Sequence, residues 1–372
     1  MKLEDYLRTR FAGLMYPAAQ AFVLNPFVRR VLFCVPFWVL FSIITIYKPE
    51  LIFDPTKVFQ AKISFNNDTF KTLISPDYIG YGYFSLHSLY IAFVFYLTHN
   101  SLIFNTLIIL PFLIGVIWQT MILGEKILGP FKSPIIVLVL TVALLKPNFY
   151  LNASERAFWM FFFLWALNQI YPPHNNSLKH NISTIFALSL LTLTGLDGII
   201  AAFWLLVFDV SNTFVLKKEN SYPLSISTIF NKIKPYLWSS LPLLFFIFYQ
   251  QKNSWITISF SQSFVNESRG GESIEKIFLK IYEFIILGSI LFYSFRKTEI
   301  KNLLPNTRLI TLLFVIMILS HFFTNATFST LYLANYLILN LLCLKLISDL
   351  KANKIQTMLY LGVFIALIMS YF

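Results

Sequence analysis

Long apolar stretches separated by short polar segments follow one another along the whole chain. An α-helix needs about 20 residues to cross the hydrocarbon core of a bilayer. The pattern therefore predicts about eleven membrane-spanning helices, near residues 31–47, 79–98, 101–123, 133–147, 155–171, 184–209, 235–249, 277–295, 309–323, 329–347 and 357–372. The stretch 133–147 is short and could be re-entrant, and 184–209 is long and contains Gly195 and Gly198, which suggest a helix break beside Asp197. An error in either stretch would locally change which loops are assigned to the inside and which to the outside of the membrane.

The first thirty residues carry a different pattern, in which apolar side chains recur among charged ones. The apolar positions have helical spacing and include Leu3, Leu7, Phe11 and Leu14. This spacing predicts an amphipathic helix within residues 1–30, lying on the cytoplasmic face of a membrane. Residues 31–372 are predicted to form a single transmembrane domain.

Composition agrees with a membrane location and excludes most soluble classes. Of the 372 residues, 57% are hydrophobic and 12% are charged, whereas a soluble domain normally carries about 25% charged residues. So few charged side chains could not cover the surface of an ordinary cytosolic enzyme. The same composition excludes a disordered chain. The predicted fold is an all-α, polytopic transmembrane helical bundle.

The distribution of basic residues predicts the orientation. The chain has 29 Lys and Arg against 17 Asp and Glu, a net charge of +12. Because cytoplasmic loops are enriched in Lys and Arg, the basic segments are expected inside. They lie around positions 29–30, 217–234, 296–308 and 351–354. The N-terminus is then cytoplasmic and the C-terminus lies outside. No basic run adjoins a soluble module, so nucleic-acid binding is not expected.

The same alternation distributes the remaining loops between the two sides. It puts the two longest outer loops at 48–78 and 250–276. It also puts segment 171–183 outside, and segments 148–154 and 210–234 inside. Chemistry at the outer face is therefore expected to come from the two long loops and the helix ends beside them.

Carboxylates are scarce in this chain, so those of loop 48–78 are candidates for chemistry. Asp54 lies just beyond the first predicted span, and Asp68 and Asp77 follow further along the loop. A carboxylate at the outer mouth of a helix bundle can act as a general base toward a substrate hydroxyl or hold a divalent cation. The alternative is that these carboxylates only keep an outer surface hydrated.

Two further positions combine charge with an apolar helix. Glu155 and Arg156 begin such a helix, where Ser154 as N-cap and the helix dipole would also explain them. Asp197 lies inside or near the membrane plane, where a charge costs about 2.5–3.5 kcal/mol and is by default a functional-site hypothesis. All three charged residues are candidates for substrate binding.

Arg269 and His87 complete the candidate substrate-binding set. Arg269 is followed by two glycines in loop 250–276 and can bind a phosphate or pyrophosphate bidentately; an ordinary solvated loop is the alternative. His87 lies about one helical turn inside the second predicted span, where a histidine is more often packed than catalytic. The five histidines show no metal-ligand spacing, so they predict no metal site.

The order of these segments resembles the GT-C superfamily, the polytopic glycosyltransferases that use polyprenyl-phosphate-linked sugars. Members have an Asp or Glu in a long first outer loop, a position that Asp54 matches in LIFDPTKVFQAKI. Three further features of the family have similar segments here. The aromatic entry to the second span resembles DYIGYGYFSLHSLYIAF, and the basic, Gly-containing turn resembles LGEKILGPF. The helix that begins with Ser-Glu resembles the one at Ser154-Glu155. LTGLDGII is an altered counterpart of a later motif, because Leu196 and Asp197 stand where a basic residue is expected. The resemblance covers residues 31–210.

The resemblance implies an inverting glycosyltransferase that acts at the outer face of the membrane. Asp54 would deprotonate the acceptor hydroxyl. Asp68 or Asp77 would bind the acceptor or a divalent cation, and Arg269 would hold the donor phosphate. The implied partners are a polyprenyl-phosphate-linked sugar, a glycan, lipid or protein acceptor, and membrane lipids.

Two other interpretations fit the same pattern. An O-antigen-polymerase-like or lipid-linked-glycan transport protein also has polar outer loops, but it uses several outward-facing arginines, for which Arg269 and Arg156 are the candidates. A non-catalytic membrane subunit of a glycan-assembly complex needs none of the acidic residues. The chain is rich in Lys, Asn, Ile and Phe and has no long loops. This composition favours a bacterial inner membrane under all three interpretations.

Overall fold

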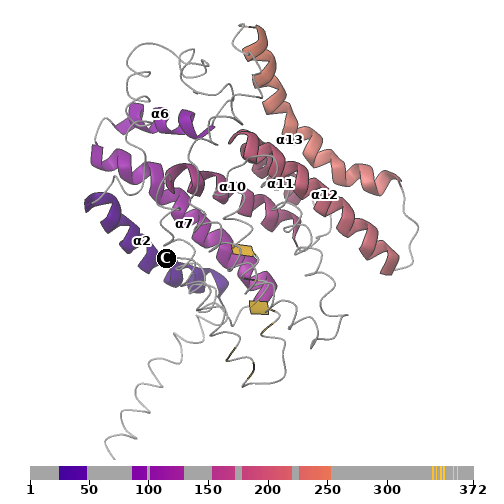
Figure 1. The fold of residues 1–372 in the computed structure, drawn as a ribbon, viewed down its shortest axis with the longest axis horizontal. Coiled ribbons are helices and arrows are strands. Elements are labelled where there is room, and N and C mark those ends of the chain that lie inside the picture. The colour runs from indigo at the N-terminus through magenta and orange to yellow at the C-terminus, as the bar shows by residue number, and fades with distance from the viewer. Residues whose placement is uncertain are drawn as a thin grey trace, which may run out of the picture.

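A computed structural model describes residues 25–47, 86–98, 101–129, 153–171, 178–219 and 226–252, together with isolated positions between 337 and 358. This described part of the chain is helical throughout, as the sequence predicts, and contains no strand. The helices are α2 (Pro26–Tyr47), α6 (Leu86–Thr98), α7 (Ser101–Leu128), α10 (Ala153–Ile170), α11 (Leu178–Thr192), α12 (Leu196–Glu219) and α13 (Ile226–Lys252) (Figure 1). The predicted amphipathic helix within 1–30 lies mostly outside the described residues.

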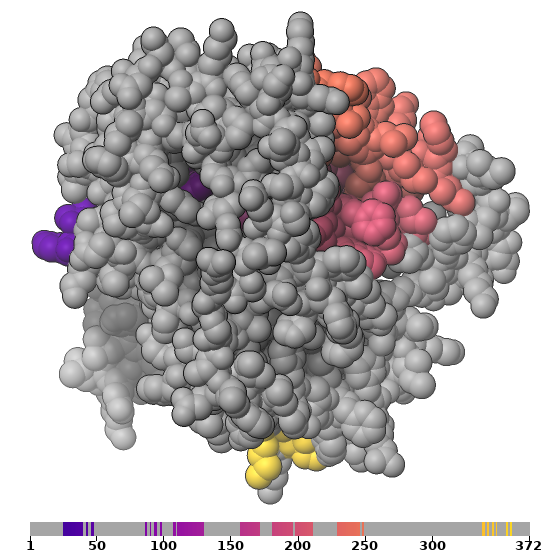
Figure 2. Space-filling view, turned by 45° about the horizontal axis from the view of Figure 1, so that its top comes forward, coloured from indigo at the N-terminus to yellow at the C-terminus, as the bar shows by residue number. Residues whose placement is uncertain are grey.

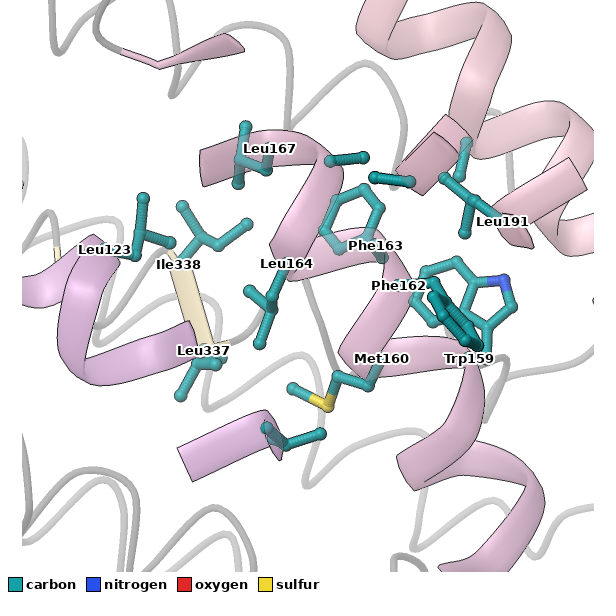
Figure 3. Packing of buried hydrophobic residues seen from close by; sticks show 14 of the residues in the cluster. Leu123, Trp159, Met160, Phe162, Phe163, Leu164, Leu167, Leu191, Leu337 and Ile338 are labelled. Carbon is teal, nitrogen blue, oxygen red and sulfur yellow. The ribbon is translucent and has the colours of Figure 1, made fainter. Parts of the chain in front are cut away.

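Helix α10 is the centre of the described bundle. Its residues 157–167 are all apolar or aromatic, and a helix that is apolar on every side is stable only when neighbours surround it. Figure 3 shows Trp159 and Phe163 pointing toward Leu191 of α11, while Leu164 points the other way, toward Leu337 and Ile338. The core is therefore built around α10 rather than beneath one amphipathic face.

Helices α7 and α10 run side by side in the same direction. In the first half of each helix, the rings of Phe112 in α7 and Phe158 in α10 have centroids 4.5 Å apart. Near their last turns, the Lys126 ammonium donates a hydrogen bond to the carbonyl oxygen of Tyr171 at 2.8 Å. An added Cβ at Gly115 would lie 2.5 Å from the ring of Phe161. The missing side chain of Gly115 thus makes room for an aromatic ring between the two helices.

Helix α2 packs against α7 and runs antiparallel to it. The Arg29 guanidinium, near the start of α2, pairs with Glu125, near the end of α7, and the two helices contact each other along their lengths. The side chain of Asn25 accepts a hydrogen bond from the Phe27 amide at 3.0 Å. An Asn cap followed by Pro in the first helical position is a common helix start. It begins α2 five residues before the predicted span at 31–47.

The predicted span 184–209 is two helices in the structure. Helix α11 ends at Thr192 and α12 begins at Leu196. Between them Gly195 has φ +135°, a backbone conformation that side chains of other residues rarely adopt. One long apolar stretch therefore folds as an antiparallel pair. The helix break that its glycines suggested is present, and the stretch is two helices and not one span.

Helices α12 and α13 also form an antiparallel pair. The Lys232 ammonium lies 3.4 Å from the Asp209 carboxylate. One helical turn further, the Tyr236 hydroxyl donates to the carbonyl oxygen of Leu205 at 3.1 Å. From the first contact to the second, the chain runs backward along α12, from Asp209 to Leu205, and forward along α13, from Lys232 to Tyr236. The two helices therefore run in opposite directions.

The described helices share two ends, which we name by one residue each. The Arg29 end contains Arg29, Glu125, Tyr171 and Asp209, linked by the ion pairs and by the Tyr171–Phe208 ring contact at 6.4 Å. The Leu193 end contains Leu193 and the starts of α6, α10 and α12.

The assignment of loops to alternating sides of the membrane, predicted from the sequence, does not agree with these shared ends. It put segments 171–183 and 210–234 on opposite sides, whereas Tyr171 and Asp209 lie at the same end. The break in stretch 184–209 explains the difference, because α11 runs from the Arg29 end to the Leu193 end and α12 runs back. Helix α6 lies at the Leu193 end beside the first half of α7 (Figure 1).

Length and composition identify a candidate membrane span within α7. Among the described residues, Leu110–Leu128 is the one helical segment long and apolar enough to cross a bilayer. Large apolar side chains are also exposed on α2 and α13, for example Trp38 and Phe245. Figure 2 shows α13 (orange) at the surface of the molecule.

Candidate functional site

Three helix starts meet at the Leu193 end, and predicted site residues lie on all three. The Leu86 amide, at the start of α6, donates a hydrogen bond to the carbonyl oxygen of Leu193 at 2.9 Å. The His87 ring lies 5.4 Å from the ring of Phe158, in the second turn of α10. Helix α12 begins three residues after Leu193. The N-terminal ends of α6, α10 and α12 are therefore neighbours.

His87 is a packed histidine in this arrangement. Its side chain is buried and contributes to an aromatic cluster with Tyr90, Phe112 and Phe158. The Tyr90 hydroxyl donates to the carbonyl oxygen of Leu107 at 2.6 Å, which ties α6 to the first half of α7. His87 thus helps to hold α6 against α10 at the edge of the candidate site.

Glu155 and Arg156 lie in the first turn of α10, at the same end as His87. The helix begins at Ala153, so Ser154 is inside the first turn and not at the capping position that the sequence suggested. The alternation predicted from the sequence put segment 148–154 inside, on the other side from His87. The geometry instead brings the Glu155–Arg156 pair into the neighbourhood of the α6 and α12 starts.

Asp197 is the second residue of α12 and lies just after the break between α11 and α12. The sequence suggested a charge inside or near the membrane plane, flanked by glycines. In the structure, Gly195 makes the turn and its carbonyl oxygen accepts a hydrogen bond from the Ile199 amide at 3.2 Å. A carboxylate in the first turn of a helix is favoured by the helix dipole, so Asp197 occupies a helix start and not a helix interior.

Trp159 adds a polar atom to this end that the sequence did not single out. The residue is buried and its ring stacks on Phe163 with centroids 5.0 Å apart. Its indole N–H has no hydrogen-bond partner among the described residues. Most buried polar atoms are paired, so this donor, beside three helix starts, is suited to an oxygen atom of a bound molecule.

The other predicted site residues lie outside the described residues. These are Asp54, Asp68, Asp77 and Arg269. Helix α2 runs from the Arg29 end toward the Leu193 end and finishes at Tyr47, seven residues before Asp54. Within the described part of the chain, no group of three His, Cys, Asp or Glu side chains could hold a metal ion.

A second polar cluster lies at the Arg29 end, and the sequence treated its residues only as loop charges or turn residues. The Glu125 carboxylate accepts hydrogen bonds from Arg29 Nε at 2.9 Å and from Arg30 Nη2 at 2.6 Å. Lys126 Nζ donates to the backbone carbonyl oxygens of Asn168 and Tyr171, near the end of α10. Adjacent Glu and Lys inside an apolar run were the signal that could have marked this cluster.

Asn168 extends the second cluster toward the middle of the bundle. Its side-chain amide donates to both the backbone carbonyl and the side-chain oxygen of Gln119, at 2.8 and 3.0 Å. Charged and amide groups therefore join the ends of α2, α7 and α10. Such buried polar contacts fix how the helices are aligned along their axes.

Comparisons with known proteins do not extend these observations. No protein-family model, no curated protein and no solved structure matches the chain.

Proposed function

We propose that the chain is a multi-pass membrane glycosyltransferase. It transfers a sugar from a polyprenyl-phosphate donor to a hydroxyl group of a glycan, lipid or protein acceptor at the outer face of a bacterial inner membrane. The Arg29 end is cytoplasmic in this proposal, because basic residues are enriched on that side. The Leu193 end is then the outer end.

The observation that supports this proposal best is the meeting of α6, α10 and α12 at the Leu193 end. The N-terminus of a helix carries a partial positive charge and free amide donors, which favour a phosphate group. Asp197, Glu155 and Arg156 lie in the first turns of two of these helices. One end of the bundle thus combines features for a donor phosphate with polar groups for a sugar.

The catalytic step rests on Asp54, which follows α2 in sequence as its chain leaves the bundle at the Leu193 end. Its carboxylate takes the proton of the acceptor hydroxyl. The acceptor oxygen then forms a bond to the anomeric carbon of the sugar while the bond from that carbon to the phosphate oxygen breaks. The bond electrons leave with the polyprenyl phosphate, and the configuration at the anomeric carbon inverts.

Exposed apolar surface supports the membrane location within this proposal. Four exposed side chains on α13 recur at spacings of four or seven residues, which puts them on one side of the helix: Phe230, Leu237, Leu241 and Phe248. Exposed apolar patches of this kind are costly in water. They are expected where a helix faces lipid.

Replacing Asp54 tests the proposal. Asp54→Asn removes the base but keeps the size of the side chain, and we expect sugar transfer to fall at least 100-fold, the lower range for general-base catalysis. The measurement is transfer of labelled sugar from a polyprenyl-phosphate donor in membranes that contain equal amounts of each variant. Glu50→Gln, in the same loop, is the matched control and should keep full activity.

Other outcomes of this experiment discriminate between the interpretations. Full activity in Asp54→Asn would remove Asp54 from the mechanism. No transfer by the native protein alone, together with stable co-purification of a partner that restores transfer, would favour a non-catalytic subunit of a glycan-assembly complex.

A further inference from the structure

The ion-pair cluster where α2 begins and α7 ends contains more cations than carboxylates among the described residues. Arg29, Arg30 and Lys126 surround one carboxylate, that of Glu125. The carbonyl groups at the end of α10 accept hydrogen bonds from Lys126, so its charge is partly balanced by that helix dipole. Arg29 and Arg30, near the positive start of α2, both pair with Glu125. Positive charge at this helix start favours a further anion beside Arg30.

Arg30 is the arginine that can reach such an anion. Its side chain is 20% exposed, against 4% for Arg29. A guanidinium group has five N–H donors, and Glu125 accepts hydrogen bonds from Nε and Nη2 of Arg30. The carbon atom of the guanidinium lies 5.8 Å from the ring centroid of Trp118, which holds the group in place. Among the described residues Glu125 is the acceptor for Arg30, so Nη1 of this partly exposed side chain can donate to a further group.

An exposed apolar stripe begins beside Arg30. The Phe27 ring contacts Trp118 as Arg30 does, with centroids 5.5 Å apart, and is 62% exposed. Val31, Val35 and Trp38 continue along α2 at spacings of three or four residues and are also exposed. Residues at these spacings share one side of a helix. The surface therefore presents a cation at one end of a strip of apolar side chains about three turns long.

We propose that this surface binds an anionic phospholipid of the cytoplasmic leaflet. The phosphate accepts hydrogen bonds from the free N–H groups of Arg30, and an acyl chain lies along Phe27, Val31 and Trp38. Planar guanidinium groups match phosphate oxygens in a bidentate geometry, and the apolar stripe matches the chain of a lipid but not a free ion. The proposal requires a membrane location but does not depend on sugar transfer.

Thermal unfolding of the purified full-length protein in detergent tests the site. We expect added phosphatidylglycerol to raise the melting temperature of the native protein by about 2 °C or more, and equimolar phosphatidylcholine to have a clearly smaller effect. Arg30→Gln should lose most of the difference between the two lipids. Lys234→Gln, which removes an exposed cation near the start of α13, is the matched control and should keep that difference.

Two further measurements test the lipid site when Arg30→Gln does not fold. Val31→Asp leaves the Arg30–Glu125 pair intact and puts a negative charge beside the expected phosphate, so it should also lose the response to phosphatidylglycerol. Inorganic phosphate, compared with chloride at the same ionic strength, should not reproduce the response. An undiminished response in Val31→Asp, or the same rise with phosphate alone, would overturn the proposal. Asp54→Asn should respond like the native protein, which separates this site from the proposed glycosyltransferase activity.

Discussion

Gly198 sets how closely α11 and α12 approach at their junction. A Cβ added at this position would lie 1.9 Å from the carbonyl oxygen of Leu191 and 2.4 Å from the hydroxyl oxygen of Thr194. That hydroxyl in turn donates to the same carbonyl at 2.7 Å. The junction therefore depends on the absence of a side chain at Gly198 and on the positive φ of Gly195.

Replacing Gly198 by Ala should destabilise the protein more than a glycine replacement that meets no neighbour. The nearest atom is backbone, which cannot move aside cheaply, so we expect Gly198→Ala to lower the free energy of unfolding by about 1–3 kcal/mol. Gly129→Ala is the comparison for backbone strain without a clash, because φ is +90° there while an added Cβ meets nothing within 4 Å. Chemical denaturation in detergent measures both. A Gly198→Ala variant as stable as the native protein would contradict the close junction.

The pairing of whole helices depends on a few polar contacts within apolar surroundings. Asp209 of α12 is buried, and its contact with Lys232 lies near the start of α13. Tyr236 adds a hydrogen bond from its hydroxyl to α12 one turn further along. An apolar interface alone would allow two helices to slide, whereas a buried ion pair fixes their relative position.

A double-mutant cycle should show that Asp209 and Lys232 interact. We expect Asp209→Asn and Lys232→Gln each to lower the free energy of unfolding, and the double variant to cost less than their sum by about 0.5–3 kcal/mol. Unfolding monitored by tryptophan fluorescence measures the four proteins. Lys234→Gln, at an exposed neighbouring position, should have little effect. Strictly additive single costs would show that the pair does not couple the helices.

For the molecule as a whole, the shared ends of the helices determine which connecting segments leave the bundle at the same end. The chain between α10 and α11 and the chain between α12 and α13 both leave the bundle at the Arg29 end. The chain between α6 and α7 leaves it beyond the Leu193 end. These relations do not depend on how many spans the rest of the chain contributes.

Cysteine labelling in sealed membrane vesicles tests this arrangement. In a background with Cys34→Ala and Cys343→Ala, we expect Asn175→Cys and Asn220→Cys to react with a membrane-impermeant maleimide from the same side. Asn100→Cys should react from the opposite side. Reaction of the first two variants from opposite sides would instead support the simple alternation of the sequence and contradict the shared end.

Much of the fold class follows from the sequence because it depends on local properties. The chain is 57% hydrophobic and has apolar runs of helical length. In the membrane location proposed for it, such runs satisfy their backbone hydrogen bonds internally as helices. The described residues confirm helices in the predicted stretches around 31–47, 101–123, 155–171 and 235–249. The predicted roles of Asp54, Asp68, Asp77 and Arg269 stay predictions.

Tertiary structure alone decided which of these helices are neighbours and where each charged residue lies. Hydropathy measures how apolar a stretch is, and it does not show where a chain reverses direction. Stretch 184–209 was therefore counted as one span, although its glycines suggested the break that the structure has at Gly195. The partners Arg29 and Glu125 are distant in sequence, and so are Asp209 and Lys232. Their pairing depends on helix packing, which no local pattern records. That the chain forms apolar helices follows from its sequence, because helix formation depends on the residues of each segment. The structure determined their order in space, because that depends on contacts between segments far apart.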